Sequence, residues 1–162
     1  MDVDKIRQAL VWQGAISAPK LINGSVEITG SPVRSMLVNA LNAEVTMYIT
    51  DFEDSSSLTW FNMIYGQVNI YDNIRNQIDF ATSRKEHKLK NDFAKLATVI
   101  VRPYGLCTVE KHLYIDGESI SASIFDFGLY FFHNTKKLVE IGKGLYFLFT
   151  KDRASFRGEM MG

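Results

Sequence analysis

The sequence ATVIV at residues 97–101 decides the fold, because five apolar or β-branched residues in a row are typical of a strand buried on both faces. Arg102 follows this run directly. An earlier run of the same kind, VTMYIT at residues 45–50, leads into the acidic segment DFED at residues 51–54. Strands buried on both faces occur mainly in parallel sheets that are covered by helices. The two runs therefore predict buried strands of an α/β protein with a parallel sheet.

Strand and helix signals alternate along the rest of the chain, without repeats or low-complexity tracts. A short helix is expected at residues 4–10, then a strand at 26–29 and a helix with Ser31 as N-cap and Pro32 as its first residue. Further expectations are a helix capped by residues 55–57, a second helical stretch over 68–78, hairpins around 83–86 and 116–117, a helix capped by Ser123, and a last strand at 145–149.

Length and composition bound the class of protein. The 162 residues can bury one core, but they fall short of the roughly 250 residues of a closed (β/α)8 barrel. Eighteen basic residues balance eighteen acidic ones, so no nucleic-acid partner is expected. No stretch approaches the roughly eighteen apolar residues of a membrane span, and the opening residues lack a secretory signal. We therefore expect a protein of the cytoplasm that does not enter a membrane.

The single cysteine, Cys107, excludes an internal disulfide. Its apolar neighbours predict a buried, inert thiol rather than a nucleophile. The three histidines do not have the spacing of a metal site.

Charged residues follow both predicted buried strands, at the edge of a parallel sheet where ligands bind. The carboxylates of Asp51, Glu53 and Asp54 could hold a hard cation such as Mg²⁺ or orient its waters, or they could form a solvated helix entry. Arg102 could stabilise a developing oxyanion, or it could pair with one of these acids. The pattern alone leaves these alternatives open.

Several segments, in the right order, resemble malate synthases of the shorter, plant and enterobacterial type. They are VEITG at 26–30, DFEDS at 51–55 with LTW at 58–60, VRP at 101–103 with Gly105, EKH at 110–112, DGE at 116–118, and the most specific, SIFDFGLYFFHN at 123–134. The resemblance covers roughly residues 12–149. It implies part of a TIM (β/α)8 barrel at residues 26–149, with about four parallel strands and a hairpin insertion. In such a barrel the strands ending at Thr50 and Val101 would be neighbours, with their charged residues at the same edge. Residues 1–25 would lead into this barrel, and 150–162 would be a divergent tail.

The resemblance also implies an activity, that of an acyltransferase of the glyoxylate cycle. Malate synthases condense acetyl-CoA with Mg²⁺-bound glyoxylate and hydrolyse the product to malate and CoA. Arg102 matches the catalytic arginine that faces the enolate, while Glu53 and Asp54 match an acidic pair beside the metal and its waters. The principal metal ligands and the aspartate base of the family would lie beyond Gly162. The chain is therefore expected to be a truncated copy that is inactive alone.

Two other interpretations stay open, namely half of a split enzyme completed by a C-terminal chain, and a non-catalytic binding module. YGL at residues 104–106 also stands where the family commonly has Arg-Gly-Trp, which changes the surroundings of Arg102. A barrel cut after four strands would have unpaired edges, so self-association is expected. The sequence ends without the Ser-Lys-Leu type of tripeptide that directs the plant enzymes to peroxisomes, which again favours the cytoplasm.

Overall fold

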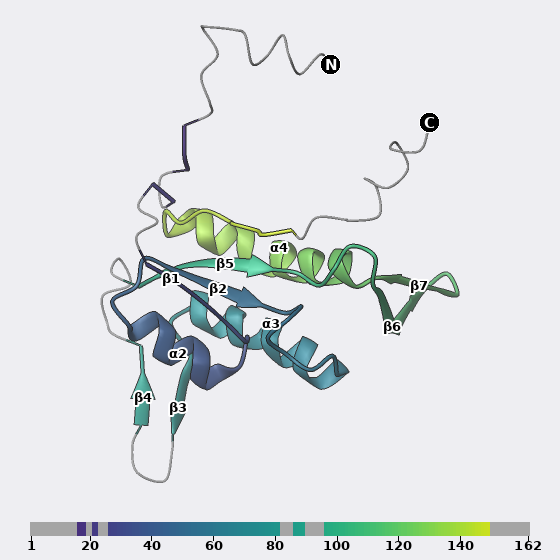
Figure 1. Ribbon diagram of the computed structural model, residues 1–162, viewed down its shortest axis with the longest axis horizontal. Helices are drawn as coiled ribbons and strands as arrows, with labels where there is room; N and C mark the ends of the chain where they lie inside the picture. The colour runs from purple at the N-terminus through teal and green to yellow at the C-terminus, as the bar shows by residue number, and fades with distance from the viewer. Residues whose placement is uncertain (1–15, 19–20, 23–25, 82–85, 90–95, 150–162) are drawn as a thin grey trace, which may run out of the picture.

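The central sheet has three parallel strands in the order β1–β2–β5 (Figure 1). The computed structural model describes residues 16–18, 21–22, 26–81, 86–89 and 96–149. The strands are β1, Glu27–Gly30, β2, Met47–Asp51, and β5, Thr98–Arg102. The predicted last strand at residues 145–149 is reduced to a single parallel bridge between Val101 and Phe147. The sheet is open, as predicted for part of a barrel. The expected helix at residues 4–10 and the tail at 150–162 lie outside the described residues.

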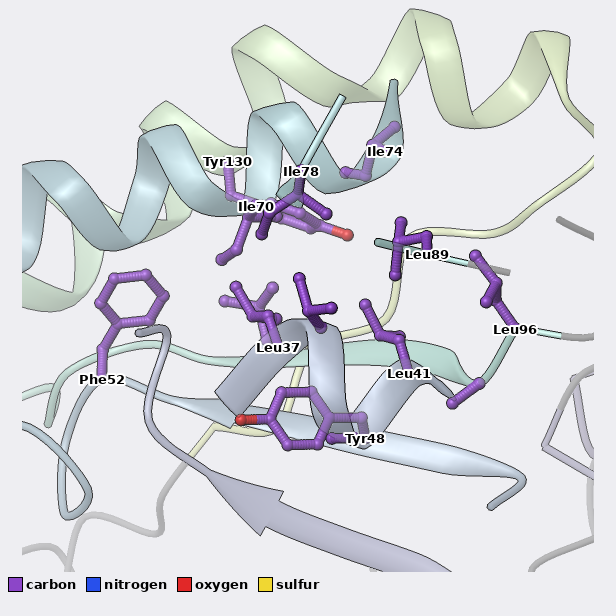
Figure 2. Close-up of a cluster of buried hydrophobic side chains, with 14 of the residues drawn as sticks. Leu37, Leu41, Tyr48, Phe52, Ile70, Ile74, Ile78, Leu89, Leu96 and Tyr130 are labelled. Atoms are coloured by element: carbon purple, nitrogen blue, oxygen red, sulfur yellow. The ribbon is translucent and has the colours of Figure 1, made fainter. Parts of the chain in front are cut away.

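Three helices pack on one face of this sheet. They are α2, Arg34–Asn42, α3, Trp60–Ile74, and α4, Ala122–Glu140. Between them and the sheet lies the main hydrophobic core, whose members are largely withdrawn from solvent. Figure 2 shows side chains from all three helices and from β2 in this core, among them Leu37, Leu41, Tyr48, Ile70 and Tyr130. Burial of these side chains supplies the main driving force that holds the helices on the sheet.

The opposite face of the sheet carries a smaller cluster and leads to the charged residues. Successive strand residues point to opposite faces, so Met47 and Ile49 lie on the face away from the core around Tyr48. There they form a second cluster with Ile100 of β5. Asp51 and Arg102 continue these two rows of side chains at the carboxyl ends of β2 and β5.

Two hairpins lie outside the central sheet, one beside α2 and the other beyond the end of β5 (Figure 1). One pairs β3, Asp79–Ala81, with β4, Glu86–Lys88, and the other pairs β6, Val109–Ile115, with β7, Glu118–Ser121. Both lie where the sequence predicts a hairpin. Asp116 and Gly117 make the second turn with φ angles of 53° and 84°, the left-handed region that such two-residue turns require. The β6–β7 hairpin lies toward the carboxyl ends of the strands, on the side of the charged residues.

The prediction of two helical stretches after β2 is wrong, because α3 is one continuous helix. Its N-cap is Thr59, whose hydroxyl oxygen accepts a hydrogen bond from the Asn62 amide at 3.2 Å. Residues 55–57 remain in the loop before it. Gly66 does not break the helix but lets it approach Phe52, the residue that follows β2, since a Cβ there would lie 2.6 Å from the Phe52 ring.

The predicted caps of the other two helices are also displaced. The N-cap of α2 is Val33 rather than Ser31, because the Ser31 hydroxyl lies 2.9 Å from that of Ser56 and joins the two loops instead. The N-cap of α4 is Ser121 rather than Ser123, which is buried inside the first turn. A serine is well suited to an N-cap, so Ser31 and Ser123 are both reasonable choices from local sequence. In the structure the Ser31 hydroxyl contacts Ser56, and Ser123 is buried within the helix.

The prediction of a buried thiol is wrong, because Cys107 is exposed. It lies in a tight turn after β5, where the Thr108 amide donates a hydrogen bond to the Gly105 carbonyl oxygen at 3.0 Å. An apolar neighbourhood in sequence does not bury a residue at the tip of a turn. Within the described part of the chain, none of the helices combines the length and the hydropathy that crossing a membrane requires.

Candidate active site

Arg102 and the acidic segment meet at the carboxyl edge of the sheet. Asp51 is the register partner of Arg102 in the parallel pair β2–β5. The Phe52 amide extends this pairing with a hydrogen bond to the Arg102 carbonyl oxygen at 3.1 Å. The prediction that the two strands are neighbours, with their charged residues at the same edge, is confirmed.

The guanidinium of Arg102 makes ion pairs with all three carboxylates. Its Nη1 lies 3.1 Å from Asp51 Oδ2, and its Nη2 lies 2.8 Å from Glu53 Oε2 and 2.7 Å from Asp54 Oδ2. The side chains of Asp51 and Glu53 are 2% and 21% exposed, whereas that of Asp54 is 66% exposed. Burial lowers the pKa of Arg102, but the three carboxylates raise it by more, so its pKa lies above the ordinary value.

Asp51 organises the acidic loop around itself. Its Oδ1 accepts hydrogen bonds from the amides of Glu53 at 2.9 Å and Asp54 at 3.1 Å, while its Oδ2 faces Arg102. One buried carboxylate thus holds both the loop backbone and the guanidinium. The segment is therefore a folded loop that presents Glu53 and Asp54 to Arg102, and Asp51 is the residue that shapes it.

The loop at residues 103–108, which follows β5, packs against the Glu53 carboxylate. A Cβ at Gly105 would lie 2.9 Å from Glu53 Oε1, so only glycine lets the backbone come this close without moving that carboxylate. Leu106, at the position where the sequence departs from Arg-Gly-Trp, is exposed in this loop. The Nε of Arg102 is buried and has no hydrogen-bond partner within the described part of the chain.

A further carboxylate supports this loop, and sequence reasoning did not identify it as part of the site. Asp126 of α4 is fully buried and accepts a hydrogen bond from the Tyr104 amide at 3.0 Å. Burial raises the pKa of Asp126 to about 7, although hydrogen bonds from Tyr104 and Gln67 oppose the rise. A sequence signal for Asp126 exists, because every fourth residue of α4 is buried, namely Ala122, Asp126, Tyr130, Asn134 and Leu138. Asp126 and Asn134 are polar residues within this otherwise apolar or aromatic series.

The described residues do not form a metal site by themselves. Carboxylate oxygens suit Mg²⁺, but among residues 26–81, 86–89 and 96–149 no three His, Cys, Asp or Glu side chains are grouped so that they could hold an ion. Glu53 and Asp54 are engaged with Arg102 instead. The donor set in hand does not fit a bound cation without further ligands.

Parallel strands, helices packed on one face and a charged site at the carboxyl edge define the class, which is part of a TIM barrel. The family model "Malate synthase, TIM barrel domain" matches residues 98–158.

Malate synthases of several organisms are similar over most of the chain. The glyoxysomal malate synthase of Candida tropicalis is 40% identical over 151 residues, which are 93% of this chain and 27% of that protein. Malate synthase A of Escherichia coli K12 is 43% identical over 130 residues, or 80% of this chain and 24% of that protein. The glyoxysomal malate synthase of Cucurbita maxima is 42% identical over 125 residues, or 76% of this chain and 22% of that protein.

The chain is therefore a malate synthase homologue that corresponds to part of the TIM barrel domain. It spans about a quarter of the length of these curated relatives.

Proposed function

We propose that this chain supplies the arginine side of a malate synthase active site, which condenses acetyl-CoA with glyoxylate to form malate and CoA. The observation that carries the proposal is the guanidinium of Arg102, held at the carboxyl edge of the sheet by Asp51 and Glu53. Removal of a proton from the acetyl methyl group places negative charge on the thioester oxygen. A fixed cation stabilises that charge more than a mobile one, because it does not have to reorganise during the reaction.

The environment of Arg102 supports this role. Its side chain is 21% exposed, so a substrate could reach it while most of the surrounding water is excluded. Its pKa is raised, which keeps the cation charged at any physiological pH. Its buried Nε–H has no partner in the described part of the chain and is a donor in excess of those that the three carboxylates use.

Glu53 and Asp54 would lie beside a metal ion rather than hold it. When bound, Mg²⁺ would polarise the glyoxylate aldehyde as a Lewis acid. Ligands for the ion would have to come from residues other than those described, and Glu53 and Asp54 would accept hydrogen bonds from its waters. Their ion pairs with Arg102 hold the two carboxylates at the carboxyl edge of the sheet, where ligands bind in parallel α/β folds.

These 162 residues are inactive by themselves under this proposal, and activity requires residues that complete the barrel. A complementing C-terminal chain or a longer form of the protein would supply them. The partners are acetyl-CoA and glyoxylate, with no nucleic acid or membrane, and the location is the cytoplasm. Imaging of a tagged protein would test the location.

A chimera tests the role of Arg102. Residues 26–149 would replace the matching segment of Escherichia coli malate synthase A, and malate formation would be measured directly. We expect an active chimera in which Arg102→Met lowers kcat by roughly 10²–10³-fold, the usual effect of losing one oxyanion donor.

The matched control is Arg34→Met. Arg34 pairs with Asp72 at 2.9 Å and with Asp79 at 3.5 Å, away from the charged edge, so this variant should retain activity within about threefold. Equal activities of the two variants would contradict the role of Arg102. Malate formation by the isolated chain, abolished by Arg102→Met, would contradict the need for further residues, and binding of acetyl-CoA or glyoxylate without turnover in the chimera would favour a binding module.

A further inference from the structure

We infer that Asp126 is a positioning residue for the ion pair between Arg102 and Glu53, acting through the loop at residues 103–108. The inference rests on the proposed function only in that this pair then serves catalysis. Asp126 touches neither partner of the pair, and its effect passes through backbone that it holds.

The first step is the contact between Asp126 and the loop. Asp126 Oδ2 accepts a hydrogen bond from the Tyr104 amide at 3.0 Å. Tyr104 lies two residues after Arg102, with the buried Pro103 between them. Proline restricts its own φ and the conformation of the residue before it, so little backbone freedom separates the two positions. Holding the Tyr104 amide therefore constrains the direction in which β5 leaves the sheet.

The second step leads from the loop to Glu53. Gly105 directly follows Tyr104, and the Cβ that it lacks would lie 2.9 Å from Glu53 Oε1. The backbone at Gly105 therefore packs against the Glu53 carboxylate on its Oε1 side. On the other side, Glu53 Oε2 lies 2.8 Å from Arg102 Nη2. If the loop moved away, Glu53 could leave the guanidinium and turn toward solvent.

The loop is anchored to α4 at two points one helical turn apart. The Ala122 amide donates a hydrogen bond to the Thr108 carbonyl oxygen at 2.9 Å, which fixes the far end of the loop. Asp126, four residues later, fixes the near end at Tyr104. Because residues four apart lie on the same face of a helix, one turn of α4 holds the whole loop.

A role in packing alone does not account for a carboxyl group at this position. Asp126 is fully buried on the core face of α4, where an apolar side chain would avoid the cost of removing a carboxylate from water. Its second oxygen lies 3.5 Å from Gln67 Nε2, while Gln67 Oε1 is buried without a partner in the described part of the chain. If the Gln67 amide reversed, it could accept a hydrogen bond from an asparagine at position 126.

This geometry makes asparagine a conservative replacement and leucine a disruptive one. In Asp126→Asn the Oδ1 can still accept from the Tyr104 amide, and Nδ2 can donate to Gln67 Oε1. In Asp126→Leu the Tyr104 amide loses its acceptor. The matched control is Asn134→Leu, which removes a second fully buried polar group from the same stripe of α4. Asn134 contacts Arg75 at 3.0 Å and lies away from the loop.

The experiment is amide hydrogen exchange by NMR on the full chain, together with the Nε–H resonance of Arg102. We expect Asp126→Leu to accelerate exchange at residues 104 and 105 by roughly 10–100-fold and to shift the Arg102 resonance. Asp126→Asn should stay within about threefold of the wild type. Asn134→Leu should lower global stability but leave the exchange rates at residues 104 and 105 and the Arg102 Nε–H resonance unchanged. If Asp126→Leu does not fold, Asp126→Ala is used in its place, because it removes the same hydrogen-bond acceptor.

Unchanged exchange and an unchanged Arg102 resonance in Asp126→Leu or Asp126→Ala would overturn the inference, and so would equal effects from Asn134→Leu. These readouts need no substrate, so they are independent of the proposed function. In the chimera, Asp126→Leu should lower kcat more than it raises KM, and Asp126→Asn should restore kcat. A disturbed loop in Asp126→Leu combined with a harmless Arg102→Met would support the inference and overturn the proposed function.

Discussion

Replacing Arg102 with methionine would remove the cation that forms ion pairs with Asp51, Glu53 and Asp54. Methionine keeps much of the apolar stem and its packing, so the change isolates the guanidinium. Three carboxylates would then face one another at the edge of the sheet. We expect the free energy of unfolding to fall for this reason.

The size of the loss follows from the exposure of each carboxylate. Removing one partner of a buried ion pair costs about 3–5 kcal/mol, and Asp51 is only 2% exposed. Asp51 keeps its two backbone hydrogen bonds, which compensate for part of this cost. Asp54 is 66% exposed, so water and salt already screen its pair with Arg102. We therefore expect Arg102→Met to lose about 2–4 kcal/mol at pH 7.

Urea denaturation followed by tryptophan fluorescence measures this change. Trp60 reports on the fold, since its ring lies 5.6 Å from that of Phe125. Asp54→Asn is the matched control, and it should change stability by no more than about 1 kcal/mol. A double-mutant cycle of Arg102→Met with Asp51→Asn should give a coupling energy of at least about 1 kcal/mol, as expected for residues in direct contact.

A loss below about 0.5 kcal/mol for Arg102→Met, the size typical of surface changes, would refute the reasoning. The same conclusion would follow if Arg102→Met and Asp54→Asn had equal effects, because the burial of Asp51 would then contribute nothing. A coupling energy near zero would mean that Asp51 and Arg102 do not form their ion pair in solution.

Gly66→Ala should destabilise the chain by about 1–3 kcal/mol despite the higher helix propensity of alanine, because its Cβ would lie 2.6 Å from Phe52 and 2.8 Å from Pro32. Thermal melting measures this, and a stabilised variant would contradict the close contact of α3 with Phe52. Burial raises the pKa of Asp126 from 3.8 to about 7, so the folded chain binds more protons than the unfolded chain between these values and its stability falls as the pH rises through this window. Asp126→Asn should remove this dependence of stability on pH and be more stable than the wild type at pH 8. Urea denaturation at several pH values measures the free energy of unfolding, and the same pH dependence in both proteins would argue against this prediction. Within the described residues, the sheet edges at β1 and at the Phe147 bridge have no strand partner, so they should cause self-association. Light scattering across a concentration series measures this, and a monomer that melts cooperatively would contradict the expectation.

Local pattern was sufficient to predict the strands of the sheet and the two hairpins. Buried strands need continuous apolar runs such as residues 97–101, and tight turns need residues such as Gly117 that tolerate positive φ. Both requirements concern neighbours in sequence, so they can be seen without a structure. The caps of α2 and α4 were misplaced because Ser31 and Ser123 both satisfy the local requirement for a cap. The structure instead places Val33 and Ser121 at these positions, and the Ser31 hydroxyl contacts the distant Ser56.

For the candidate site, the sequence by itself determined which residues lie at the carboxyl edge, because Asp51 and Arg102 each end a buried parallel strand. It left open whether the arginine pairs with the acids. The three-dimensional packing was needed to show that all three carboxylates contact one guanidinium, and that Asp126 of α4, 22 residues after Tyr104, holds the adjoining loop. The physical reason is that hydrogen bonds and ion pairs act over about 3 Å, and such distances between segments far apart in sequence are set by how the helices pack on the sheet.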